Sequence, residues 1–115
     1  MRVPRSRFDE LAAEALDALP AWVQDRMENV EVVTESHPPA GQPNLLGLYH
    51  GIPLTKRGLG YSGVLPDTIT LYRSTIMNEA RDEPQLRRVI AHTVAHEIAH
   101  HFGISDERLL EIDAY

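Results

Sequence analysis

The sequence predicts a small α+β domain, in which a small mixed sheet packs against an N-terminal helix and a long second helix. Apolar residues recur at helical spacing near the N-terminus and again over residues 84–102. Between these helical patterns lie residues 30–35 and 67–74, where β-branched residues cluster and apolar and polar residues alternate. A chain of 115 residues with 43% hydrophobic residues suits one domain, spanning residues 1–115, with a single core.

Composition and charge argue against several classes of function. The net charge is −6 and no basic stripe is present, so we expect no nucleic-acid partner. No apolar run approaches about 18 residues, so we expect no membrane span. The N-terminus lacks the apolar core of a signal peptide, and a cytoplasmic location is the default expectation. The chain has no cysteine, so a metal site has to use His, Asp or Glu.

The N-terminal segment predicts two helices. Ser6 followed by Asp9 is similar to a capping box, and apolar residues at helical spacing then run to Leu19. Pro20 ends this helix and can open the next one, a short helix that we expect to end near Asn29.

Three segments between the helices are expected to be strands, in a sheet of three or four strands. Residues 30–35 are largely β-branched, residues 45–51 follow a loop rich in proline, and residues 67–74 show the clearest alternation. The connection over residues 51–63 contains four glycines, so we expect it to be irregular or hairpin-like.

A long helix is expected from the acidic residues before Pro84 to about Phe102, a length of about 28 Å. Gly103 follows, and glycine can adopt the left-handed conformation that turns the chain at the C-terminus of a helix. The next polar residues, Ser105 and Asp106, look like the cap of a short last helix, SDERLLEI.

Four of the six histidines lie within residues 92–101. His96 and His100 are four residues apart, so their side chains leave the same face of a helix, about 40° from each other. Neutral imidazoles are good ligands for Zn²⁺. Glu97 is rotated by about 100° and is therefore better placed to hydrogen-bond a water on the ion than to bind the ion beside His100.

Two histidines hold zinc weakly, so a third protein ligand is needed. The stretch HEIAHHFGISD has the pattern HExxHxxGxxD and offers Asp106, because a turn at Gly103 redirects the chain toward the ion. The alternative for Asp106 is a role as the N-cap of the last helix alone. A His₂Asp set also accepts divalent ions other than zinc.

The neighbouring histidines have open roles. His92 lies one turn before His96 on the same stripe, so it either borders the site or makes an ordinary polar contact. His101 is rotated by about 100° from His100 and is expected in packing or on the surface. The simpler alternative for the motif itself is a pair of packed histidines beside a solvated Glu97.

At these residues the chain resembles the zincin metallopeptidases, and most closely the Asp-zincin variant with its motif HExxHxxGxxD. It is also similar to small bacterial proteins described as minimal zincins. That resemblance extends over LGLYHGIPLTKRG (46–58) and GVLPDTITLYRS (63–74). It implies a minimal zincin-like domain without a C-terminal subdomain.

The resemblance implies one zinc ion per chain, bound by His96, His100 and Asp106. It implies that Glu97 is the general base and later the proton donor. It also implies that an edge strand before the active-site helix lines the cleft and pairs with an extended substrate, and the matching segment is residues 67–74. The residues then expected to contact the substrate are Thr70, Leu71 and Tyr72.

The activity implied is zinc-dependent hydrolysis of a peptide bond in a peptide or protein substrate. Nine residues follow Asp106, too few for the C-terminal subdomain and Met-turn of the larger metzincins. No motif identifies a group that stabilises the oxyanion, for which Tyr115 and His92 are candidates. The alternative is a non-enzymatic, zinc-stabilised binding domain, because structural zinc supplies about 10 kcal/mol of apparent folding free energy. The presence of Glu97 argues against that alternative.

Overall fold

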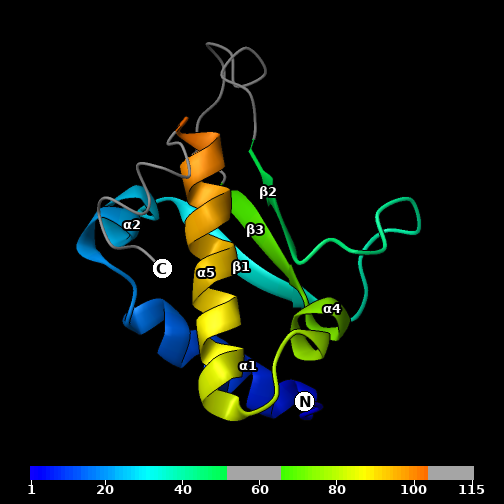
Figure 1. The fold of residues 1–115 in the computed structure, drawn as a ribbon. Coiled ribbons are helices and arrows are strands. Elements are labelled where there is room, and N and C mark those ends of the chain that lie inside the picture. The colour runs from blue at the N-terminus through cyan, green and yellow to red at the C-terminus, as the bar shows by residue number, and fades with distance from the viewer. Residues whose placement is uncertain (52–65, 104–115) are drawn as a thin grey trace.

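A three-stranded mixed sheet and the long helix that crosses it form the centre of the protein (Figure 1). The structure is a computed structural model that describes residues 1–51 and 66–103. In chain order the elements are α1 (Arg5–Asp17), α2 (Ala21–Arg26), β1 (Val30–Glu35), β2 (Gly47–His50), β3 (Asp67–Tyr72), α4 (Arg73–Asn78) and α5 (Glu83–His101). The expected α+β class with a small mixed sheet is confirmed.

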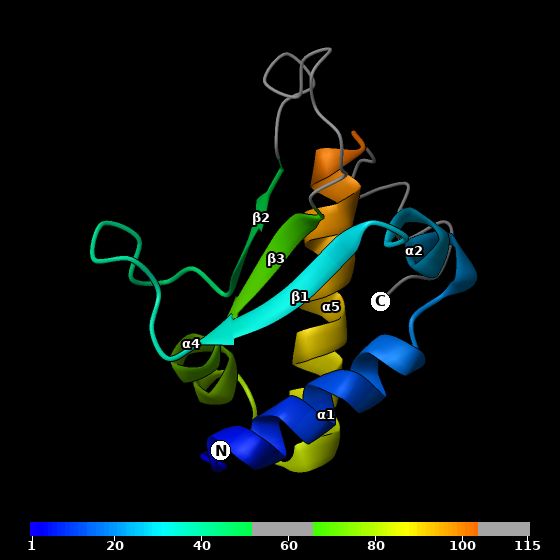
Figure 2. The same cartoon turned by 180° about the vertical axis from the view of Figure 1, so that it is seen from behind.

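The strand order β1–β3–β2 places β3 in the centre of the sheet. β1 pairs with β3 in parallel, and β2 pairs with β3 antiparallel. Figures 1 and 2 show α5 against one face of this sheet, with α1 packed beside α5. The expectation that residues 67–74 form an edge strand is therefore wrong, because β3 has a partner strand on each side.

The core lies between α5, α1 and one face of the sheet. Its largest fully buried side chains are Phe8, Leu11, Val23, Ile69, Leu71, Ile76, Leu86, Ile90, Val94 and Ile98. Burial of each such side chain contributes about 1.5–3 kcal/mol. Four of them recur at i, i+4 spacing along α5, so this stripe faces inward and the opposite stripe of the helix is left for the histidines.

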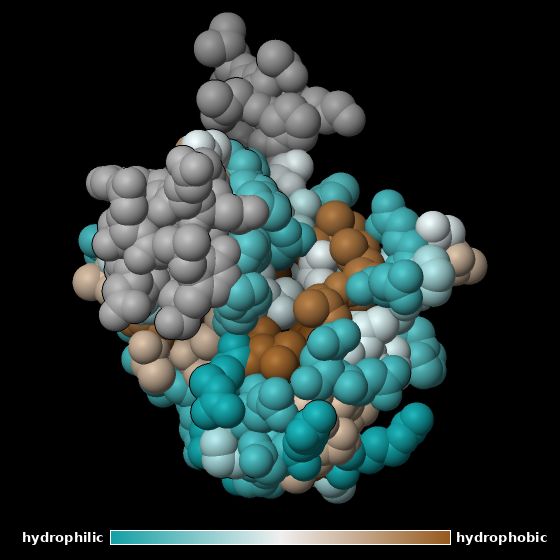
Figure 3. Space-filling model, in the orientation of Figure 1, coloured by the Kyte–Doolittle hydropathy of each residue, from teal (hydrophilic) through white to brown (hydrophobic). Residues whose placement is uncertain are grey.

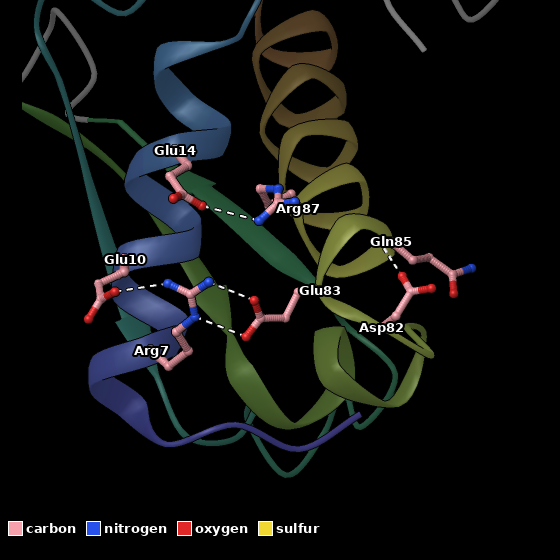
Figure 4. A network of polar contacts seen from close by, with 7 residues as sticks. All are labelled: Arg7, Glu10, Glu14, Asp82, Glu83, Gln85 and Arg87. Carbon is pink, nitrogen blue, oxygen red and sulfur yellow. Dashed lines mark hydrogen bonds and ion pairs between the residues drawn. The ribbon is translucent and has the colours of Figure 1, made fainter.

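Ion pairs also join α1 to α5 near the start of the long helix (Figure 4). Arg7 donates from Nε and Nη2 to the two carboxylate oxygens of Glu83, at 2.9 and 2.6 Å, and from Nη1 to Glu10 at 2.9 Å. Arg87 donates to Glu14 at 3.3 Å. The two-point contact with Glu83 is directional, so it helps to set the angle between the two helices.

Both ends of α5 agree with the sequence prediction. Asp82 is the N-cap, and its side chain accepts a hydrogen bond from the N–H of Gln85 at 2.8 Å, with Pro84 in the first turn. Phe102 follows the last helical residue, and Gly103 has a φ of 73°. This left-handed conformation, which a residue with a Cβ adopts only with strain, turns the chain after the last histidine.

The capping box expected at Ser6 is wrong. α1 begins two residues earlier, at Arg5, with Pro4 at the N-cap position and no side-chain cap. The N–H of Phe8 donates to the carbonyl of Pro4 at 2.9 Å, which places Ser6 inside the first turn. Asp9 instead accepts a hydrogen bond from Thr34 Oγ1 at 3.1 Å. Its side chain therefore contacts β1 and does not form the expected capping box.

The sequence did not predict α4. The strand expected over residues 67–74 ends at Tyr72, and the chain enters α4 without a side-chain cap. The hydroxyl of Thr75 donates to the carbonyl of Leu45 at 2.8 Å, and Ile76 is fully buried. Contacts with segments distant in sequence therefore stabilise this helix, and no local start signal marks it.

The other ends of helices and strands differ from the expected ones by a few residues. α1 and α2 end two and three residues earlier than expected, at Asp17 and Arg26, and the strand expected over residues 45–51 is limited to Gly47–His50. The expected connection over residues 51–63 and the short last helix lie outside the described residues, apart from Gly51. Within the described ranges, no helix is long and apolar enough to cross a bilayer.

Candidate metal centre

α5 carries three histidines on one face of its C-terminal half. The ring centroids of His92 and His96 are 4.3 Å apart, and those of His96 and His100 are 5.4 Å apart with nearly perpendicular planes. His96 is half-buried, and His100 is exposed. The expectation that His96 and His100 project side by side is confirmed by this arrangement.

These histidines border a groove of about 410 Å³ between α5 and the segment at residues 44–47. The wall on α5 consists of His92, Thr93, His96, Glu97 and His100. A second hollow of about 360 Å³ shares Leu46, His92 and Thr93 with the groove and continues along α5 toward Arg88. Figure 3 shows hydrophobic side chains along a hollow beside α5, so the groove has a partly apolar floor next to its polar wall.

Gly47 allows β2 to come close to α5. A Cβ at this position would lie 2.7 Å from Thr93 Cγ2 and 3.2 Å from the carbonyl oxygen of Thr70. Thr93 has little room to move, because it is buried and its hydroxyl donates to the carbonyl of Val89 at 2.7 Å. A side chain at position 47 would therefore widen the groove or strain the core.

The outer edge of β2 faces the groove. The N–H of Tyr72 donates to the carbonyl of Leu46 at 2.9 Å, so the alternation of an antiparallel ladder directs the backbone groups of Gly47 and Tyr49 away from β3. The N–H of Tyr49 donates to the carboxylate of Glu97. The carboxylate thus lies where an additional strand would meet β2.

The substrate contacts expected at Thr70, Leu71 and Tyr72 depended on an edge position for β3. β3 is paired on both sides, and Leu71 and Tyr72 are buried. Backbone pairing between substrate and these three residues is therefore excluded. Among the described strands, β2 is the edge strand beside α5. The sequence could not show this, because strand order depends on contacts between distant segments.

Glu97 is half-buried on the groove wall. Burial raises the pKa of its carboxyl, although the charge of His100 and the N–H of Tyr49 act in the opposite direction. The carboxylate lies between the histidine face and the outer edge of β2. It can accept a proton or a hydrogen bond from a small molecule in the groove.

The donor set fits zinc as far as it is described. His96 and His100 offer two adjacent imidazoles beside an open groove, which suits a catalytic zinc site with a free coordination position. Over residues 1–51 and 66–103, no three metal-ligating side chains are arranged so that they could hold one metal ion. Asp106, the third expected ligand, and Tyr115 lie outside these ranges. Ligation by His96, His100 and Asp106 therefore stays a prediction.

The two neighbouring histidines occupy the expected positions. His92 borders the groove, and its part as an oxyanion stabiliser stays a prediction. His101 stacks on the ring of Tyr49, with centroids 4.0 Å apart and planes 16° apart, which confirms a packing role.

Gly47 and Tyr49 carry no sequence motif that marks them as residues of the site. Their segment, LGLYHG (46–51), contributed to an expected strand and to the family resemblance, but not to the expected site. A glycine within a strand pattern often marks a close approach of another segment, and Gly47 carried that signal. No local pattern predicts the contact between Tyr49 and Glu97, which lie 48 residues apart in sequence.

Comparisons with known proteins agree with the fold. A family model described as zincin-like metallopeptidase matches residues 27–115, which is more than half of the chain and begins after α2. The structure of a conserved hypothetical protein from T. thermophilus is similar, with a TM-score of 0.58 and 24% identity. That similarity covers 87% of this chain and 94% of the other, and at this identity it shows the fold alone. No curated protein matches the chain.

Proposed function

Because the chain belongs to the zincin-like metallopeptidase family, we propose that it is a zinc-dependent hydrolase that cleaves a peptide bond. The observation that supports this most directly is the position of the Glu97 carboxylate. It lies in a groove between the His96–His100 pair and the outer edge of β2. A purely structural metal site has no use for a carboxylate at this place.

His96 and His100 are the proposed zinc ligands on α5, and Asp106 is the proposed third ligand. When bound, zinc would polarise the scissile carbonyl and lower the pKa of a water molecule to about 7. The groove beside His96 is open, so a peptide can reach this position.

The protein side chains and backbone would then perform two tasks. An extended peptide would pair with the backbone of Gly47 on β2, which orients the scissile bond over the histidine face. A Glu97 carboxylate oxygen would accept the proton of the attacking water and donate it to the leaving nitrogen.

Replacement of Glu97 by Gln tests this mechanism. We expect Glu97→Gln to retain about one zinc per chain and to lower kcat by about 10²-fold or more, because the amide cannot accept the proton. The measurements are elemental analysis and cleavage of a mixed peptide library by the zinc-loaded protein. Cleavage by Glu97→Gln at the wild-type rate would contradict the mechanism.

Histidine and aspartate variants test the proposed ligands separately. His100→Ala and Asp106→Ala should each lose zinc, whereas His37→Ala, an exposed histidine in the loop before β2, should retain it. Zinc retained by Asp106→Ala would leave Asp106 as a helix cap only. A wild-type protein that binds one zinc and cleaves no peptide would favour the non-enzymatic, zinc-stabilised binding domain.

A further inference from the structure

Tyr49 connects three elements that surround the groove. Its hydroxyl donates to Asp67 Oδ2 at 2.6 Å, its ring stacks on His101 at 4.0 Å, and its N–H donates to Glu97. We propose that Tyr49 is a positioning residue that holds β2 against the last turn of α5 and thereby determines where Glu97 and His100 lie. This inference rests on the proposed function.

Asp67 is a fixed anchor for the Tyr49 hydroxyl. It is the first residue of the central strand β3, and its N–H donates to the carbonyl of Asn29 at 3.0 Å. The chain after β2 passes close to the Asp67 carboxylate, since a Cβ at Gly51 would lie 3.3 Å from Asp67 Cγ. The hydroxyl contact therefore sets the direction of the Tyr49 ring relative to the sheet.

The ring of Tyr49 in turn restrains the end of α5. His101 is the last residue of this helix, directly after His100 and two residues before the turn at Gly103. Helix ends fray, so a side chain stacked on the last residue holds the turn that carries His100. Figure 1 shows β2 beside this end of α5.

The side chain of Tyr49 is not among the described residues that line the groove. We therefore expect it to act through Glu97 and His101 and not through contact with a substrate there. A displacement of about 1 Å at the reacting groups can lower a rate by about 10²-fold, so such an indirect contact can affect kcat strongly.

Two substitutions at Tyr49 separate its contacts. Tyr49→Phe keeps the ring stack and loses the bond to Asp67, so we expect kcat to fall about three- to tenfold with KM unchanged within about twofold. Tyr49→Leu loses both contacts, so we expect the Kd for zinc to rise about ten- to a hundredfold as well. The measurements are peptide cleavage and competition for zinc with a chelator of known affinity, both on the full chain.

His50→Ala is the matched control, because this neighbour on β2 is exposed and alternates to the other face of the strand. It should leave the Kd for zinc and kcat unchanged. A coupling test adds Asp67→Ala: in that background, Tyr49→Phe should have no further effect on kcat. A purely structural role would lower the melting temperature of Tyr49→Leu and leave Kd and kcat at wild-type values, which would overturn the inference.

The outcomes distinguish this inference from the proposed function. A wild-type protein that binds zinc and cleaves no peptide contradicts the hydrolase proposal, and the Kd of Tyr49→Leu then decides the role of Tyr49. Normal cleavage and zinc affinity in both Tyr49 variants overturn the inference alone. A wild-type protein that binds no zinc overturns both.

Discussion

At the scale of single residues, the site depends on a close approach of β2 to α5 that leaves no room for a larger side chain. Gly47 lets the edge of β2 reach α5, and Thr93 is the side chain that it meets. The backbone N–H of Tyr49 then donates a hydrogen bond to Glu97, which lines the groove. Each of these contacts joins residues that are far apart in sequence.

Gly47→Ala should destabilise the protein by about 1–3 kcal/mol, because its Cβ would overlap Thr93 Cγ2. Addition of Thr93→Ser should recover part of this loss, since serine lacks the methyl group and can keep the hydrogen bond to Val89. Gly41→Ala is the control, with no atom within 4 Å of the new Cβ, and should stay within about 0.5 kcal/mol of the wild type. Urea denaturation measures all three, and an unaffected Gly47→Ala would contradict the close packing of β2 on α5.

At the scale of elements, α5 combines a buried stripe with a functional stripe. Its apolar residues pack against α1 and the sheet, and the histidines occupy the opposite side. The helix begins at a strong side-chain cap, whereas α1 begins without one. A single polar side chain should therefore contribute more to stability at the start of α5 than at the start of α1.

Asp82→Ala should lower the free energy of unfolding by about 0.5–2 kcal/mol, because the N–H of Gln85 loses its acceptor. Ser6→Ala should change it by less than about 0.5 kcal/mol, since Ser6 lies inside α1 and caps nothing. Chemical denaturation of both variants provides the comparison. An equal decrease in the free energy of unfolding of Ser6→Ala would instead support the capping box that the sequence predicted at Ser6.

At the scale of the whole molecule, polar contacts and the proposed metal hold separate segments together. The Arg7–Glu83 pair joins α1 to α5, although α1 lies before the part of the chain that matches the family model. The proposed zinc site joins α5 to the residues after Gly103. Stability should therefore respond to both pH and metal.

Acid should weaken the α1–α5 contact. The hydrogen bonds from Arg7 hold the pKa of the Glu83 carboxyl below its ordinary value. Because the pKa of Glu83 is lower in the folded state than in the unfolded state, the ionised carboxylate stabilises the fold at a pH above the unfolded pKa, which is near 4.3. This stabilisation is lost as the pH falls toward the pKa of the folded state. The difference in melting temperature between wild type and Glu83→Gln should therefore shrink below about pH 4. A difference that is constant from pH 7 to pH 3 would contradict this.

Zinc should raise the melting temperature, because it binds the folded state. At a free concentration of 100 times Kd, the expected gain is about 2.7 kcal/mol. A chelator should reverse the gain, and His100→Ala should show neither effect. The absence of any zinc-dependent shift in the wild type would contradict the proposed site.

The sequence by itself determined the features that depend on neighbours along the chain. The start of the long helix near Pro84, the turn at Gly103 and the adjacency of His96 and His100 follow from helical geometry, which acts over one or two turns. The strand at residues 30–35 follows from β-branched composition in the same way.

Only the tertiary structure decided which strand forms the edge beside α5. Strand order depends on pairing between distant segments, so residues 67–74 became the centre of the sheet, and residues 73–78 became a helix through contacts with Leu45 and the core. The same long-range packing brought Tyr49 to Glu97 and Gly47 to Thr93. Local patterns encode none of these contacts, because residues 18 to 48 positions apart meet only when the sheet and α5 are assembled.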